Sequence, residues 1–214
     1  MPRVRRRFKF KSDDRIAITG QPGTGKSVFT NYLAHQIPHE RLLIVDPLGQ
    51  YDDFPESCRI IPKDTDPTEE FNEIARQVMA KGNMTVIVEE AQRYMPEGKA
   101  IGDDAMAMIN RGRNYGVGIV AVSQRIQHIN KNFWDVAQNI VFFRPGLKTR
   151  GHYLAEFVAR DAQLAIQALP DHEFIYYSLR DDSWNKAKLV FPGNKAPETK
   201  PAPAPAQPEV ETVA

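Results

Sequence analysis

Arg15-Ile-Ala-Ile-Thr-Gly20-Gln-Pro-Gly23-Thr-Gly25-Lys26-Ser27 carries the strongest structural signal in this chain of 214 residues. It joins an apolar strand to a glycine-rich turn and a helix start, and residues 20–27 fit the P-loop pattern G-x-x-x-x-G-K-S. Glycines tolerate positive φ and let the backbone wrap closely round an anion, whose oxygens the exposed N–H groups bind. The stretch therefore predicts a phosphate-binding loop at the positive end of a helix.

The P-loop pattern assigns a role to its residues. Lys26 would reach the β- and γ-phosphates of ATP, and the Ser27 hydroxyl would ligate Mg²⁺. A glycine-rich turn that carries a lysine by chance is the alternative, but the strand before it and the amphipathic helix after it favour the P-loop. The expected nucleotide-binding residues are Gly20, Gln21, Pro22, Gly23, Thr24, Gly25, Lys26, Ser27 and Val28.

Two adjacent acids follow another apolar strand, in Met84-Thr-Val-Ile-Val-Glu89-Glu90-Ala91. Like charges at the end of a buried strand raise each other's pKa, so a pair without a function would be costly. Glu89 is expected to hold Mg²⁺, usually through water, and Glu90 to polarise the attacking water. Most P-loop enzymes have aspartate at the first of these positions, and Glu89 is one methylene longer.

Polar residues also end the other predicted parallel strands, where ligands bind in open α/β sheets. Gln124 follows residues 118–123 and is expected beside the two carboxylates, where it would sense the γ-phosphate. Arg144 follows the strand at 139–143. Asp46, in Asp46-Pro-Leu-Gly-Gln-Tyr51, either orders the active site or caps its own turn, the commoner role for Asp before Pro.

Arg111 and Arg113 lie at the opposite end of the 118–123 strand from Gln124. Each is therefore poorly placed to reach the phosphate of its own subunit and well placed to reach that of a neighbour. A surface salt bridge is the alternative for each arginine.

Strands alternate with helices along the chain, which predicts an α/β fold with a mostly parallel sheet. The single cysteine, Cys58, excludes a disulfide framework and a cysteine-based metal site. No stretch reaches the roughly 18 apolar residues of a membrane span, and the formal net charge is only +1. Helices are expected at 26–37, 67–81, 103–115, 149–158 and 161–169, and a closing hairpin at 173–178 and 186–190.

Composition divides the chain into a basic arm over residues 1–14, a globular domain over 15–192 and a Pro/Ala-rich tail over 193–214 that is expected to be disordered. In the arm, Phe8 and Phe10 interleave with arginines and lysines. The arm is expected to form an edge strand, to touch nucleic-acid phosphates, or to be a solvated tail.

Together these motifs resemble the FtsK–HerA superfamily of DNA-pumping ATPases, over roughly residues 15–180. The motifs that carry the resemblance are Gly20–Ser27, Asp46–Tyr51, Val86-Ile-Val-Glu89-Glu90-Ala-Gln-Arg-Tyr94, Arg111-Gly-Arg113-Asn-Tyr-Gly-Val-Gly118 and Val122-Ser-Gln124-Arg125. The resemblance implies a RecA-like (ASCE) P-loop NTPase core with strand order near 5-1-4-3-2, helices on both faces and a C-terminal β-hairpin. It also implies a homo-oligomeric ring, usually a hexamer, that pumps double-stranded DNA through a central channel.

By the same resemblance, Lys26 and Ser27 bind ATP–Mg²⁺, Glu90 is the catalytic base and Gln124 is the sensor. Arg111 or Arg113 would be the arginine finger that acts on a neighbouring subunit, and Arg144 a second arginine that acts within its own subunit.

The chain shows no barrel domain, winged helix or membrane span beside this core, which makes it similar to the genome-packaging ATPases of icosahedral viruses with an internal membrane. That branch implies a place in the host cytoplasm or at the packaging vertex of the virion, with capsid or inner-membrane proteins as partners. A HerA-like cellular DNA translocase or helicase motor is the main alternative. A P-loop small-molecule kinase and a non-hydrolysing nucleotide switch are further alternatives, and the acid pair and Gln124 favour water activation over both.

Overall fold

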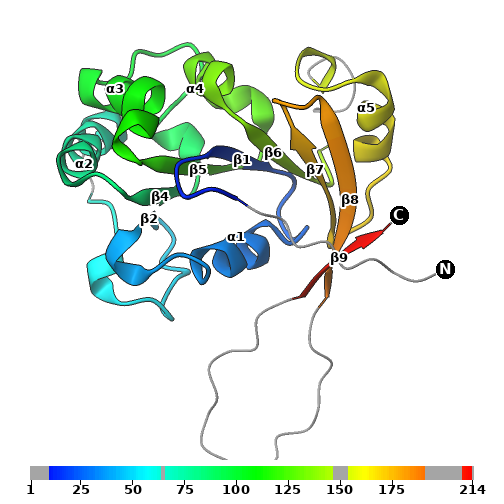
Figure 1. Cartoon of the computed structure of the whole chain (residues 1–214), viewed down its shortest axis with the longest axis horizontal. Helices are drawn as coiled ribbons and strands as arrows, with labels where there is room; N and C mark the ends of the chain where they lie inside the picture. The colour runs from blue at the N-terminus through cyan, green and yellow to red at the C-terminus, as the bar shows by residue number, and fades with distance from the viewer. Residues whose placement is uncertain (1–9, 64–65, 147–153, 191–208, 214) are drawn as a thin grey trace, which may run out of the picture.

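The computed structural model describes residues 10–63, 66–146, 154–190 and 209–213. Within them, the strands form one nine-stranded sheet in the order β3-β2-β4-β5-β1-β6-β7-β8-β9 (Figure 1). The strands β1 to β6 are parallel, and β7, β8 and β9 continue the sheet antiparallel. The strands are β1 (Arg15–Thr19), β2 (Leu42–Val45), β3 (Arg59–Ile60), β4 (Thr85–Val88), β5 (Gly118–Ser123), β6 (Asn139–Phe143), β7 (Glu173–Ser178), β8 (Ser183–Val190) and β9 (Glu209–Val213).

Helices cover both faces of this sheet. Helix α1 lies below the sheet in Figure 1, while α2, α3 and α4 lie above it. Strand residues alternate between the two faces, so Ile16 and Ile18 pack with α1 whereas Ala17 packs into the opposite core cluster. The helices are α1 (Lys26–Ala34), α2 (Pro67–Lys81), α3 (Asp103–Arg111), α4 (Lys131–Val136) and α5 (Arg160–Gln167).

The strand order confirms the RecA-like core that the sequence predicts. Read from β6, the parallel strands follow the chain order 5-1-4-3-2, and the two-residue β3 is an additional edge strand. The hairpin of β7 and β8 closes the C-terminal side, also as predicted. Because β1 to β6 are parallel, their carboxyl ends all lie at one edge of the sheet, called the carboxyl edge below.

Local signals set the bounds of α2 as the sequence predicts. Asp66 caps the helix by accepting a hydrogen bond from the Thr68 N–H at 2.8 Å, and Pro67 occupies the first helical position. Gly82 ends the helix at a φ of 64°, a conformation that favours glycine.

The helix expected over residues 103–115 is shorter than predicted. Helix α3 ends at Arg111, and a 3₁₀ turn, η4 (Gly112–Tyr115), follows it. The carbonyl oxygen of Ile109 accepts a hydrogen bond from the Arg15 side chain at 3.0 Å, which occupies an acceptor near the helix end. Much of the helix expected at 149–158 lies outside the described residues; its described part contains a 3₁₀ turn, η7 (Leu154–Glu156).

The two predicted tails differ in part from expectation. Residues 1–9 and 191–208 lie outside the described residues, but Phe10 packs edge-to-face with Phe29 at 6.2 Å and with Tyr176 at 5.6 Å. The prediction of disorder is wrong for Glu209–Val213, which forms β9 against β8. Its sequence, Glu-Val-Glu-Thr-Val, is rich in β-branched residues, and β8 would otherwise leave an open strand edge.

Candidate active site

The P-loop connects β1 to α1 at the carboxyl edge and needs its glycines for steric reasons. Gly20, Gly23 and Gly25 have φ angles of 154°, 78° and 108°. A Cβ at Gly20 would lie 2.5 Å from the Cβ of Phe143, and one at Gly25 would lie 2.7 Å from the Cδ1 of Leu189. A side chain at Gly20 would therefore displace β6, and one at Gly25 would have to push aside the Leu189 side chain of β8.

Lys26 folds back over the loop. Its Nζ donates a hydrogen bond to the carbonyl oxygen of Gln21 at 2.9 Å, and the Thr24 hydroxyl donates to the same oxygen at 2.7 Å. Burial lowers the pKa of Lys26, and the charges of Glu89 and Glu90 oppose that effect. The ammonium group therefore lies within electrostatic range of both acids.

The register of the sheet brings the two acids to the P-loop. Val88 pairs with Val45 on β2 and with Ala121 on β5, so Glu89 leaves the sheet between neighbouring strand ends. Glu89 is only 6% exposed, and burial raises its pKa to about 7. The Tyr51 hydrogen bond and the charge of Lys26 oppose this rise, while the charges of Glu90 and Asp46 add to it.

Glu90 adopts a strained backbone conformation and is held by two amide groups. Its φ of 49° and ψ of 46° place it in the left-handed region, which is uncommon for residues other than glycine and is often found at functional sites. Gln124 Nε2 donates to Glu90 Oε1 at 3.1 Å, and Gln92 Nε2 donates to Glu90 Oε2. Gln124 therefore lies beside the acid pair, as predicted, whereas Gln92 was not foreseen.

The loop after β2 adds a residue that sequence reasoning missed. Asp46 caps the loop, as one of its two predicted roles requires, by accepting hydrogen bonds from the N–H groups of Gln50 at 3.0 Å and Tyr51 at 3.1 Å. Tyr51 in turn donates its hydroxyl proton to Glu89 Oε1 at 2.5 Å. The motif Asp46-Pro-Leu-Gly-Gln-Tyr51 was the available signal, but only Asp46 received a role from it.

Arg144 lies next to the P-loop, but its side chain is already engaged. Its carbonyl oxygen accepts a hydrogen bond from the Gln21 N–H at 2.9 Å. Its guanidinium group forms an ion pair with Asp171 at 2.9 Å, just before β7. A phosphate contact by Arg144 would require this ion pair to rearrange.

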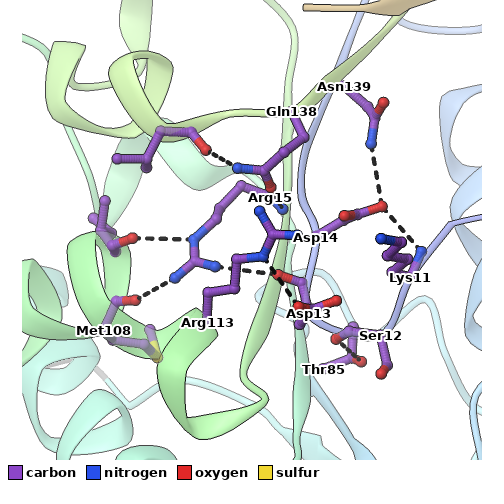
Figure 2. Close-up of polar contacts among 12 residues, drawn as sticks. Lys11, Ser12, Asp13, Asp14, Arg15, Thr85, Met108, Arg113, Gln138 and Asn139 are labelled. Carbon is purple, nitrogen blue, oxygen red and sulfur yellow. Dashed lines mark hydrogen bonds and ion pairs between the residues drawn. The ribbon is translucent and has the colours of Figure 1, made fainter. Parts of the chain in front are cut away.

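Arg111 and Arg113 lie at the amino ends of the parallel strands, at the edge of the sheet opposite the carboxyl edge where Lys26 lies. Figure 2 shows Arg113 beside Arg15 and Asp13, and Arg113 Nε donates to Asp13 Oδ2 at 3.1 Å. Arg111 is exposed at the last turn of α3. Both arginines precede β5, at the end of that strand opposite Gln124, and the finger role of either arginine stays a prediction.

The residues expected to hold Mg²⁺ have suitable chemistry. Within the described part of the chain, no group of three or more His, Cys, Asp or Glu side chains forms a metal cage. Mg²⁺ is usually bound by one or two protein oxygens together with substrate phosphates, not by an all-protein cage. The Ser27 hydroxyl and the Glu89 carboxylate are oxygen donors of that kind, at the start of α1 and the end of β4.

No family model matches the sequence, and no curated protein matches it significantly. No helix in the described ranges is long and apolar enough to cross a membrane.

Solved structures with the same fold are found at low sequence identity. The genome packaging NTPase B204 from Sulfolobus turreted icosahedral virus 2, in complex with AMPPCP, is 14% identical, with a TM-score of 0.72, over 83% of this chain and 98% of that chain. The DNA-packaging ATPase B204 from Sulfolobus Turreted Icosahedral Virus is also 14% identical over the same shares of both chains, with a TM-score of 0.68. The chain therefore has the RecA-like P-loop NTPase fold, in the form found in these viral packaging NTPases.

Proposed function

We propose that this chain is a Mg²⁺-dependent ATPase whose hydrolysis drives the translocation of double-stranded DNA, as the genome-packaging motor of a virus. The proposal of ATPase activity rests on one observation. Four side chains converge at the carboxyl edge beside the P-loop: Lys26, Glu89, Glu90 and Gln124. A loop that only bound phosphate would not need a strained glutamate held between two amides.

Each of these side chains has a role in the proposed hydrolysis. Lys26 would exchange the Gln21 carbonyl oxygen for the β- and γ-phosphates of ATP. Glu90 would accept a proton from the water that attacks the γ-phosphorus, and Gln124 would hold that carboxylate in position. Ser27 and Glu89 would hold Mg²⁺, which supplies positive charge to the phosphate oxygens.

Two variants test for ATPase activity and separate nucleotide binding from ATP hydrolysis. Lys26→Ala should sharply weaken nucleotide binding, because it removes the phosphate contact. Glu90→Gln should bind ATP yet hydrolyse it at least ~100-fold more slowly, the usual size of a general-base contribution. Binding is measured with a fluorescent ATP analogue and turnover by phosphate release. Hydrolysis by Glu90→Gln at the wild-type rate would show that another group is the base.

The DNA-packaging part of the proposal is supported by the structural similarity to B204, a DNA-packaging ATPase. Turnover is measured with duplex DNA, with single-stranded DNA and without DNA. Stimulation by duplex DNA that falls steeply with added salt is the expected result, because phosphate contacts release counterions. Equal turnover in all three conditions would contradict coupling to DNA.

The biological task is tested in the native virus. A nonsense mutation in this gene should yield empty but otherwise complete capsids. The ring would then act in the host cytoplasm or at a packaging vertex, beside capsid or inner-membrane proteins. Full infectious particles without the protein would favour a HerA-like cellular DNA translocase instead.

A further inference from the structure

Tyr51 is a buried tyrosine that reaches the active site from outside the P-loop and the acid pair. It is 1% exposed, and its hydroxyl donates to Glu89 Oε1 at 2.5 Å. Burial, with smaller contributions from Glu89 and Asp46, raises the pKa of Tyr51 far above its usual value. The hydroxyl is therefore a neutral hydrogen-bond donor at any pH at which the protein would work.

Two further elements fix the position of this hydroxyl. Asp46, itself fully buried, accepts the Tyr51 N–H at 3.1 Å and so anchors the backbone of the loop to the end of β2. Thr30, on the α1 helix that begins at Lys26, lies beside the Tyr51 hydroxyl and donates its own hydroxyl proton to the Lys26 carbonyl oxygen at 3.0 Å. Tyr51 thus connects the P-loop helix to the strand end that carries Glu89.

Glu89 needs such a support more than an aspartate would. Its additional methylene adds a rotatable bond, and fixing a free side chain on ligand binding costs conformational entropy. The hydrogen bond to Oε1 restrains that rotation in advance and leaves Oε2 as the second carboxylate oxygen. Hydrogen bonds to the outer groups of a metal site commonly orient the ligands in this way.

We propose that Tyr51 is a positioning residue for the metal–nucleotide complex: it holds Glu89 in the orientation that binds Mg²⁺, directly or through water. The inference rests on the proposed function, because it requires that a metal-bound nucleotide occupy the P-loop. It adds a residue from the β2 loop to a site otherwise built from the P-loop, the acid pair and Gln124.

The test measures metal affinity rather than turnover. Mn²⁺ serves as the probe, and its binding to protein with AMPPCP is followed by electron paramagnetic resonance in wild type and in Tyr51→Phe, which removes only the hydroxyl. The same proteins are titrated with a fluorescent ATP analogue in EDTA. Tyr94→Phe is the matched control, because Tyr94 is also fully buried and its hydroxyl has no hydrogen-bond partner among the described residues.

Tyr51→Phe should weaken Mn²⁺ binding about 10-fold or more, since hydrogen bonds to charged groups are among the stronger ones and 1.4 kcal/mol corresponds to tenfold. Metal-free nucleotide affinity should stay within about twofold, and Tyr94→Phe should change neither quantity. In a Glu89→Gln background, adding Tyr51→Phe should change Mn²⁺ affinity less than about twofold, because the two residues act through one contact.

Three results would overturn the inference. A Tyr51→Phe protein that binds Mn²⁺ like wild type would show that the hydroxyl does not position Glu89. Equal losses in both backgrounds, or equal losses with and without metal, would show a role in folding only. If wild type bound no nucleotide at all, the proposed function itself would fail, and the EDTA titration distinguishes that outcome from these three.

Discussion

At the scale of single residues, Glu89 is the group whose charge state responds most directly to folding. Burial raises its pKa from 4.5 to about 7, so the folded protein holds a proton that the unfolded chain releases between these pH values. Stability from this group is therefore fully present below pH 4.5 and is lost as the pH rises through 7.

We predict that, without metal and nucleotide, Glu89→Gln becomes more stable relative to wild type as the pH rises from 5 to 8. The gain is on the order of 2–3 kcal/mol, because one pKa unit corresponds to about 1.4 kcal/mol. The measurement is urea unfolding at several pH values with EDTA present. Asp103→Asn, at an exposed acid in the first turn of α3, is the control and should show a much smaller pH dependence. Parallel curves for Glu89→Gln and wild type would contradict the prediction.

At the scale of elements, the end of α3 is held by a side chain from β1. Arg15 is 1% exposed, and its guanidinium group donates to the carbonyl oxygens of Ile109 at 3.0 Å and Met108 at 3.2 Å (Figure 2). A positive charge at the negative end of a helix is favourable, and the Met108 oxygen accepts the Arg15 side chain in addition to the Gly112 N–H. Burial lowers the pKa of Arg15, and the nearby charge of Arg113 lowers it further.

We predict that Arg15→Met destabilises the protein by about 2–3 kcal/mol, because it keeps a similar volume but removes the hydrogen bonds that a buried charged group donates to the end of α3. Arg113→Met is the matched control. It breaks only a partly exposed ion pair with Asp13, so its cost should stay below about 1 kcal/mol. Unfolding in urea measures both variants. Equal effects of the two substitutions would show that Arg15 does not support α3 in this way.

At the scale of the whole molecule, the two ends of the parallel strands carry complementary groups. Lys26 and the acid pair lie at the carboxyl edge, and Arg111 and Arg113 lie at the amino edge of the same sheet. One chain cannot bring these edges together, whereas neighbouring subunits of a ring can place one edge against the other. An active site shared between subunits is therefore the arrangement that we predict.

The prediction is tested by mixing two inactive variants, Lys26→Ala and Arg113→Ala. Some interfaces of a mixed ring would combine an intact P-loop with an intact arginine, so part of the activity should return. Each variant alone should hydrolyse ATP about 10³-fold more slowly or worse, which is the usual effect of losing an arginine finger. No regain at any mixing ratio, in rings shown to be mixed, would exclude Arg113; Arg111→Ala would then be tested in the same way.

Most of the fold and half of the candidate site can be predicted from the sequence, because their signals are local. The P-loop, the acid pair and the bounds of α2 are written in stretches of about 8 to 17 neighbouring residues, with glycine spacing, apolar runs and caps as the evidence. Gln124 is also predictable, since parallel strands must end at the same edge.

The remaining features depend on which residues meet across the fold. Tyr51 and Glu89 are 38 positions apart, and Arg15 and Ile109 are 94 positions apart. Neither residue in these pairs carries a local sign of its partner, and the end of α3 and the support of Glu89 arise only from such long-range contacts. The same holds for β9, whose five residues look like part of a polar tail until the open edge of β8 offers them hydrogen bonds. Local patterns specify backbone conformation, but the partner of a buried polar group is chosen by packing, which only the folded chain contains.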